Sequence, residues 1–138
     1  MKRESIIMGM PVTVLIADLS AKEKDIDSIF SYFKKIDKKF STYKKDSEIE
    51  KINRGEIKKN EYSLEMKKIL KLCETTKKQT NGYFDIKING KLDPSGIVKG
   101  FAIHEAAKIL DRIGYKNFCS SEFIRINEVN EIIFFSFY

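Results

Sequence analysis

The chain has 138 residues, of which 42% are hydrophobic and 33% charged, with two cysteines and two prolines. This composition excludes a disordered chain, a collagen-like repeat and a disulfide-stabilised scaffold, and the length fits one domain. The formal net charge is +6, and all of it comes from residues 34–78, where 15 Lys or Arg stand against 8 Asp or Glu. We interpret this basic stretch as a solvated helix face, because it has little arginine and no glycine–aromatic interleaving.

No apolar run reaches the roughly 18 residues that are needed to cross a membrane. The N-terminal residues lack the continuous apolar core of a signal peptide, and the two cysteines are too scattered for a metal framework. These features predict a cytoplasmic protein without a membrane span.

The first predicted element is a strand. Hydrophobic residues alternate with smaller or polar ones from Met8 to Ile16, which is the pattern of a half-buried strand. Pro11 lies inside this run, so we expect the strand to lie at a sheet edge or to carry a bulge.

A helix is predicted to follow this strand. Ser20 and Glu23 have the spacing of a capping box, which marks a helix start. Apolar residues then recur at three- and four-residue spacing from Ile26 to Phe40 and give one apolar stripe. Residues 41–55 follow neither period and are predicted to form a loop with short helical turns.

A second helix is predicted to begin after Ser63, with Asn81-Gly82 at its end, since glycine adopts a left-handed conformation at the lowest cost. Its predicted apolar positions are Leu64, Met66, Ile69, Leu70 and Cys73. Residues 83–88 alternate like a strand, and Asn89-Gly90 has the pattern of a tight turn.

The run Asp93-Pro-Ser-Gly96 leads into a third predicted helix, which Gly114 ends. Its predicted buried face consists of Ala102, Ile103, Ala106, Ala107, Leu110 and Ile113. A strand is predicted to begin within residues 115–119. Intermixed helices and strands of this kind predict one α+β domain. The apolar segment 132–138 predicts association into dimers or larger assemblies.

The densest group of chemically special residues is the run from Asp93 to Gly100. Gly96 allows a close backbone approach, Lys99 adds a positive charge near a helix start, and Asp93 adds a carboxylate that suits a ligand hydroxyl or Mg²⁺. A helix start with a proline turn and a solvent-facing lysine explains the same spacing equally well. His104 is predicted to be a surface or half-buried helix residue, and both cysteines are predicted to lie in the core.

Several motifs, in the expected order over residues 8–119, resemble the ApbE family of FAD:protein FMN transferases. They are Met8-Gly9, Phe40-Ser-Thr-Tyr43, Ser47-Glu-Ile49, Asn53, Asn81-Gly-Tyr-Phe-Asp85 and Asp93-Pro-Ser-Gly-Ile-Val-Lys-Gly100. The resemblance implies an α+β fold with the mixed sheet and helices of that family. It also implies an enzyme that uses Mg²⁺ to transfer FMN from FAD to a Ser or Thr hydroxyl of an acceptor flavoprotein, with no nucleic acid as partner.

The resemblance implies roles for eight residues. The positions that match FAD contacts are Met8, Tyr43, Tyr83, Phe84, Asp85, Asp93 and Lys99. Gly96 matches a position that offers Mg²⁺ its main-chain carbonyl. Aromatic and thioether side chains suit a flavin or adenine ring, and a lysine beside a helix start suits phosphate oxygens. No residue is assigned as catalytic.

The chain departs from the family after Phe118-Cys119. The family continues with an Asn-Ala-Gly-Gly-Asp run and later Mg²⁺ ligands, and neither is found in the last 19 residues. We therefore expect an ApbE-like N-terminal region at 1–119 and a divergent tail at 120–138. Two alternatives stay open: a truncated, non-catalytic flavin- or protein-binding remnant of the family, and a basic nucleic-acid-binding module that rests on charge alone.

Overall fold

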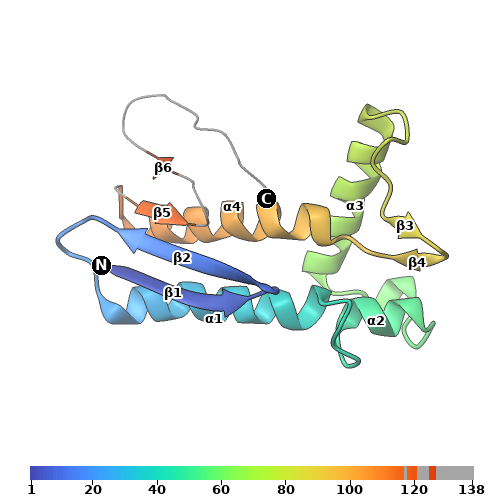
Figure 1. The fold of residues 1–138 in the computed structure, drawn as a ribbon, viewed down its shortest axis with the longest axis horizontal. Coiled ribbons are helices and arrows are strands. Elements are labelled where there is room, and N and C mark those ends of the chain that lie inside the picture. The colour runs from blue at the N-terminus through green and yellow to red at the C-terminus, as the bar shows by residue number, and fades with distance from the viewer. Residues whose placement is uncertain (117, 121–124, 127–138) are drawn as a thin grey trace. The chain divides into compact units, whose positions relative to one another are not determined.

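The computed structural model describes residues 1–116, 118–120 and 125–126 (Figure 1). These residues form two compact units, one from residues 1–34 together with the described residues from Ala102 onward, the other from Lys35–Phe101. Helices and short sheets alternate along the chain, which confirms the predicted α+β class.

The first unit contains a four-stranded antiparallel sheet. Its order is β1 (Lys2–Ile7), β2 (Met10–Ile16), β5 (Phe118–Ser120) and β6 (Arg125–Ile126). Strand β1 was not predicted, because its residues alternate between exposed and half-buried positions and none of them is apolar before Ile6. A half-polar strand of this kind leaves no strong apolar period to detect.

The turn between β1 and β2 consists of Met8 and Gly9, whose φ angles are 56° and 72°. Positive φ at both central residues is the type I′ arrangement, whose twist matches that of the flanking strands. The strand predicted from Met8 therefore begins two residues later, at Met10.

The prediction that Pro11 marks an edge strand or a bulge was wrong. Strand β2 lies between β1 and β5, and its register against β1 is continuous. Pro11 pairs with Ile6, one step beyond the pair of Ile7 and Met10 that closes the hairpin. Alternate residues of an antiparallel pair turn their N–H groups away from the partner, so β1 does not need the N–H that proline lacks. On the other side, described β5 pairs only with β2 residues 14–16.

The core of the first unit joins β2 to parts of α1 (Glu23–Phe40) and α4 (Ser95–Ile113), and Figure 1 shows the sheet lying along both helices. Its buried side chains include Val12, Val14, Ile16, Ile26, Ile29, Phe33, Ala102, Ala106 and Leu110. Arg3 pairs with Glu23 and Asp27 near the start of α1, and its guanidinium lies 5.9 Å from the Phe30 ring centroid. The apolar stripe predicted from Ile26 to Phe40 is buried and therefore confirmed.

The start of α1 does not use the predicted capping box. The helix begins at Glu23, so Ser20 is not at its N-cap. The hydroxyl of Tyr115 takes this place: it accepts a hydrogen bond from the Lys22 N–H at 3.2 Å and donates to Asp25 Oδ2 at 2.6 Å. The bond to the Asp25 carboxylate, with burial, raises the pKa of Tyr115. A side chain far along the sequence therefore bonds the free N–H at this helix start, where we predicted a cap by the nearby Ser20.

The second unit begins with the last part of α1, and α2 (Glu48–Asn53), the short 3-10 helix η1 (Lys59–Glu61) and α3 (Leu64–Gln79) follow. Helix α3 starts as predicted, since the Ser63 hydroxyl accepts from the Met66 N–H at 3.2 Å. It ends before Asn81 and Gly82, whose φ angles are 52° and 81°. Both ends follow from short-range backbone preferences.

The core of the second unit gathers side chains from its parts of α1 and α4, from α2 and α3, and from the residue before α4. They are Ile36, Phe40, Ile49, Met66, Ile69, Cys73, Pro94 and Val98. Cys73 is buried as predicted, and burial raises its pKa to about 11. Leu64 is an exception in the predicted stripe, because its side chain is exposed.

Strands β3 (Lys87–Ile88) and β4 (Lys91–Leu92) form a small antiparallel hairpin. The turn between them is Asn89-Gly90, with φ angles of 51° and 78°, which confirms the predicted tight turn. The predicted strand was too long, because residues 83–86 lie outside β3.

Helix α4 confirms the third predicted helix, with Ala102, Ile103, Ala106 and Leu110 buried. Ile113 is exposed, contrary to its predicted burial, and His104 is exposed as predicted. Among the described residues, no helix has the length and apolar content to cross a membrane.

Three predictions concern residues that lie wholly or mostly outside this description. The side chain of Cys119 and the segment 132–138, with its expected self-association, are not among the described residues. The division of the chain into a region 1–119 and a tail 120–138 therefore stays a prediction.

Candidate functional site

The two units divide the eight residues that the sequence singled out. Met8 belongs to the first unit, where it forms half of the β1–β2 turn. The other seven belong to the second unit and lie on three segments: the loop before α2, the segment between α3 and β3, and the start of α4. They are Tyr43, Tyr83, Phe84, Asp85, Asp93, Gly96 and Lys99.

Asp93 stands at the junction of β4 and α4. Its Oδ1 accepts a hydrogen bond from the Ser95 N–H at 3.0 Å, and its own N–H donates to the Ile86 carbonyl at 2.8 Å. Pro94, which follows, is fully buried, and its carbonyl accepts from the Val98 N–H at 3.0 Å as the helix begins. The carboxylate is half-buried, and within the described part of the chain its Oδ2 has no partner. One oxygen of Asp93 is therefore available to a ligand.

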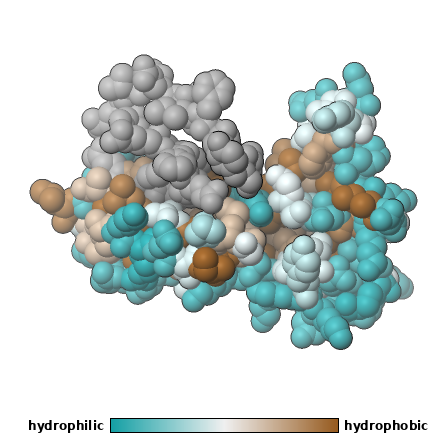
Figure 2. Space-filling view, viewed as in Figure 1, coloured by the Kyte–Doolittle hydropathy of each residue, from teal (hydrophilic) through white to brown (hydrophobic). Residues whose placement is uncertain are grey.

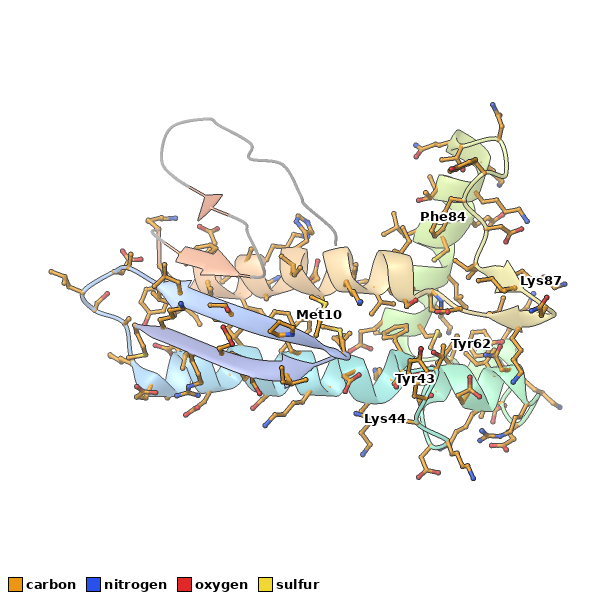
Figure 3. The ribbon with its side chains drawn as sticks, viewed as in Figure 1. Met10, Tyr43, Lys44, Tyr62, Phe84 and Lys87 are labelled. Atoms are coloured by element: carbon orange, nitrogen blue, oxygen red, sulfur yellow. The ribbon has the colours of Figure 1, made fainter. Side chains whose placement is uncertain are left out.

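Phe84 packs against the first turn of α4. Its Cε2 lies 3.7 Å from the point where a Cβ at Gly96 would stand, which is an ordinary van der Waals distance, so the ring lies against the helix at this residue. The Phe84 N–H donates to Thr80 Oγ1 at 3.0 Å, and that hydroxyl donates to the Thr76 carbonyl at 2.8 Å. The last turn of α3 thus holds Phe84, which Figure 3 shows alongside that helix.

Asp85 is exposed and already has two partners. Its Oδ2 pairs with Lys77 Nζ at 2.6 Å, and its Oδ1 accepts the Lys87 N–H at 3.0 Å. The hydrogen bond from Lys77, followed by the one from the Lys87 N–H, lowers the pKa of Asp85. A ligand at Asp85 would therefore meet a charged carboxylate that is held in one orientation.

Tyr43 and Tyr83 leave their rings almost wholly uncovered. Each side chain is 96% exposed, so neither contributes to the core. Figure 3 labels Tyr43 in the loop that precedes α2. Figure 2 shows apolar surface over the part of this unit that holds α3 and β3, where Leu72 and Ile88 are exposed. Exposed aromatic rings with a polar tip suit stacking on a flat ligand ring.

Lys99 lies in the second turn of α4 and is half-buried. It makes no hydrogen bond or ion pair with any residue that the structure describes. Its charge is therefore not neutralised, and it lies near a helix start whose first N–H groups favour anions. The N–H groups of Ser95, Ile97 and Val98 already bond Asp93 or Pro94, so Lys99 and the Gly96 N–H are the donors here that can hold phosphate oxygens.

Asn53 is a residue whose role the sequence analysis missed, although it belongs to one of the motifs quoted there. Its side chain bonds both the N–H and the carbonyl of Leu92, 39 residues away in sequence. No local pattern predicts such a contact, because it depends on how α2 and β4 meet in the folded unit.

The model of the ApbE family matches residues 8–90, which is more than half of the chain. The chain belongs to the ApbE family. Five of the eight predicted site residues, from Met8 to Asp85, fall inside the matched range, and Asp93, Gly96 and Lys99 follow it. No curated protein matches the chain by sequence.

Solved ApbE structures share the fold of this chain. A mutant of the flavin transferase ApbE from Vibrio cholerae has a TM-score of 0.77 at 17% identity, over 88% of this chain and 59% of its own. The ApbE protein from Thermotoga maritima has a TM-score of 0.77 at 17% identity, over 87% and 56%. The apo flavinyl transferase ApbE from Pseudomonas stutzeri has a TM-score of 0.73 at 16% identity, over 88% and 54%. This ApbE chain therefore spans less than two thirds of the length of these proteins.

The described residues of this ApbE chain do not form a Mg²⁺ site by themselves. They contain no group of three or more His, Cys, Asp or Glu side chains placed to hold a metal ion. Gly96 is the second residue of α4, where its carbonyl takes part in the helical hydrogen-bond ladder. Mg²⁺ demands near-ideal octahedral oxygen ligands, and these residues do not supply them.

The basic stretch of this ApbE chain lines a separate groove of about 440 Å³. Its lining residues are Lys35, Lys38, Lys39, Asp46, Glu48, Lys51, Ile57, Glu61 and Ser63. Glu65, beside it, pairs with Lys39 at 2.7 Å and Lys35 at 3.0 Å, and Glu48 accepts the Ser63 N–H at 2.7 Å. Acidic groups therefore compensate much of the lysine charge here.

The pair of Glu65 and Lys39 gives a pH-dependent prediction. The hydrogen bond from Lys39 is the main reason that the pKa of Glu65 falls from 4.5 to about 2. A lowered pKa stabilises the fold above pH 4.5 and loses that effect as the pH falls towards 2. We expect Glu65→Gln to lower the free energy of unfolding by about 1 kcal/mol at pH 7, since partial exposure screens the pair.

Urea denaturation over a series of pH values measures this effect, and the difference from wild type should shrink between pH 4.5 and 2. Glu74→Gln is the matched control, because Glu74 and Lys78 are both exposed and their pair is worth a few tenths of a kcal/mol. A Glu65→Gln difference that stays the same from pH 7 to pH 2 would contradict the assignment.

Proposed function

We propose that this chain supplies an FAD-binding part of an FAD:protein FMN transferase. The observation that carries the proposal is the junction of β4 and α4, where Phe84 packs on Gly96 and Asp93 keeps one free carboxylate oxygen. Membership of the ApbE family supports it. The uncompensated Lys99 in the second turn of the same helix fits the negative charge of a pyrophosphate.

Different residues are proposed to contact the rings, the phosphates and the hydrogen-bonding groups of FAD. Exposed Tyr43 and Tyr83, together with Phe84, offer aromatic surface to the flavin or adenine ring. Lys99 binds phosphate oxygens together with the Gly96 N–H, since the N–H groups of Ser95, Ile97 and Val98 already bond Asp93 and Pro94. Asp93 Oδ2 accepts a hydrogen bond from a ligand N–H or hydroxyl. Asp85, paired with Lys77, completes the proposed FAD contacts of the second unit, and the contact of Met8 with FAD stays a prediction from the resemblance.

The proposed reaction is a transfer of FMN to a Ser or Thr hydroxyl of an acceptor flavoprotein. The hydroxyl oxygen forms a bond to the phosphorus on the FMN side of FAD, the bond from that phosphorus to the bridging oxygen breaks, and AMP leaves while the hydroxyl loses its proton. The proposal includes the family's use of Mg²⁺, but the described residues do not hold this ion. A flavin-binding member without transfer activity is the second candidate, which the lack of a metal cluster among the described residues favours.

An equilibrium titration with FAD tests the binding function. We expect Lys99→Ala to weaken FAD binding by about tenfold, because it removes a charge opposite the pyrophosphate in a site partly shielded from water. Riboflavin, which lacks the phosphates, should bind equally well to wild type and to Lys99→Ala. Raising the salt concentration should reduce the difference for FAD.

Lys68→Ala is the matched control, because Lys68 is an exposed lysine of α3 with no partner among the described residues. It should leave FAD affinity unchanged. An equal loss of FAD affinity in Lys68→Ala and Lys99→Ala would show that only the net charge of the protein matters. It would contradict the assigned phosphate contact of Lys99. A wild-type chain that binds neither FAD nor riboflavin would overturn the proposed function.

A further inference from the structure

The side-chain amide of Asn53 joins the end of α2 to the end of β4. Its Oδ1 accepts the Leu92 N–H at 2.8 Å, and its Nδ2 donates to the Leu92 carbonyl at 3.0 Å. Nδ2 also lies 3.3 Å from Glu50 Oε1, which takes its second hydrogen. The opposite orientation of the amide would set donor against donor and acceptor against acceptor, so only this one satisfies both groups of Leu92.

The register of the hairpin explains why Leu92 needs this partner. Asp93, the next residue, donates its N–H to the Ile86 carbonyl beside β3 at 2.8 Å. Successive residues of an antiparallel strand direct their backbone groups to opposite sides. Leu92 therefore turns its N–H and carbonyl away from β3, and Asn53 meets both of them. A single side chain thus takes the place of a third strand at this edge.

These bonds fix the chain immediately before the proposed ligand site. Asn53 holds Leu92, the Ile86 carbonyl holds the Asp93 N–H, and the Asp93 carboxylate holds the Ser95 N–H at 3.0 Å. We propose that Asn53 is a positioning residue that orients the Asp93 carboxylate and the first turn of α4 for FAD. This inference rests on the function proposed above. Asn53 acts through Leu92, because its amide is already occupied by protein groups.

Hydrogen exchange tests the contact without any ligand. In Asn53→Ala the Leu92 N–H loses its acceptor, so we expect its exchange, followed by NMR, to become about tenfold faster. Asn53→Asp keeps an acceptor for the Leu92 N–H but sets a carboxylate oxygen against the Leu92 carbonyl and Glu50 Oε1, so its Leu92 amide should exchange faster than in wild type and more slowly than in Asn53→Ala. This second variant also serves if Asn53→Ala does not fold.

Titration with FAD tests the consequence for the site. We expect about tenfold weaker FAD binding in Asn53→Ala, with far-UV circular dichroism and the thermal midpoint close to those of wild type. Asn53→Asp should also weaken FAD binding, because its carboxylate loses the bond to the Leu92 carbonyl and is repelled by Glu50. Asn60→Ala is the matched control, since Asn60 is exposed in η1 with no partner among the described residues, and it should change neither measurement.

The outcomes separate this inference from the proposed function. Unchanged exchange of the Leu92 amide in Asn53→Ala would overturn the contact itself. Faster exchange with unchanged FAD affinity would overturn the positioning role and leave the proposed function standing. No FAD binding by wild type would refute the proposed function, and the positioning of Asp93 for FAD with it, while the exchange rates would still decide whether Asn53 holds β4.

Discussion

Replacing Phe33 with alanine should lower the free energy of unfolding by about 3–5 kcal/mol, the usual cost of emptying a large buried site. Phe33 lies in α1, its side chain is fully buried, and its ring makes an edge contact with Phe30 at a centroid distance of 6.4 Å. The neighbouring buried side chains of α1, Ile29 and Phe30, limit how far the helix can move to fill the gap. Urea denaturation followed by circular dichroism measures the change.

Leu19→Ala is the matched control for this prediction. Leu19 is as large as a core residue, but its side chain is completely exposed, so its removal should change stability by less than about 0.5 kcal/mol. A loss below about 1 kcal/mol in Phe33→Ala would show that the core around α1 is not packed as the structure describes.

We expect the chain alone to bind FAD without transferring FMN to an acceptor. Phosphoryl-type transfer depends mainly on positioning and on compensating the charge at the transferred phosphorus. The described residues supply Lys99 and the Gly96 N–H at the start of α4, and they contain no cluster of metal-binding side chains. Such a set can bind the phosphates, but it does not hold the metal ion that this chemistry uses.

The measurement is mass spectrometry of an acceptor flavoprotein after incubation with the chain, FAD and Mg²⁺. The flavin transferase from Vibrio cholerae serves as the positive control for the acceptor. Acceptor that carries the added mass of FMN, and that loses it when the chain carries Asp93→Ala, would contradict this prediction. That result would show that residues outside the described ranges, or a second chain, complete the site.

The sequence predicted which residues belong to the candidate site better than it predicted how they are arranged. The motif Asp93-Pro-Ser-Gly96 indicated a helix start with an available carboxylate, and the structure places α4 there with Asp93 Oδ1 on the Ser95 N–H. The packing of Phe84 on Gly96 and the pairing of Asp85 with Lys77 could not be predicted in the same way. Each depends on where α3 ends relative to α4, which no local pattern encodes.

The sequence by itself determined the elements whose ends depend on neighbouring residues. Helix α3 begins at the Ser63 cap and ends before Asn81-Gly82, and the hairpin turns at Asn89-Gly90. In each case one or two residues decide where the element starts, ends or turns. They do so because a side chain accepts a hydrogen bond from a free N–H, or because the residue adopts a positive φ at low cost. Such preferences act within a few residues and need no tertiary partner.

Only the tertiary structure decided the features that join distant segments. Strand β1 has too little apolar pattern to be predicted alone, and it exists because β2 pairs with it. The start of α1 bonds the Tyr115 hydroxyl in place of the nearby Ser20 side chain, and β4 bonds Asn53 in place of another strand. The physical reason is the same for all three: a backbone group that leaves water must find a partner, and the fold brings that partner from far along the chain.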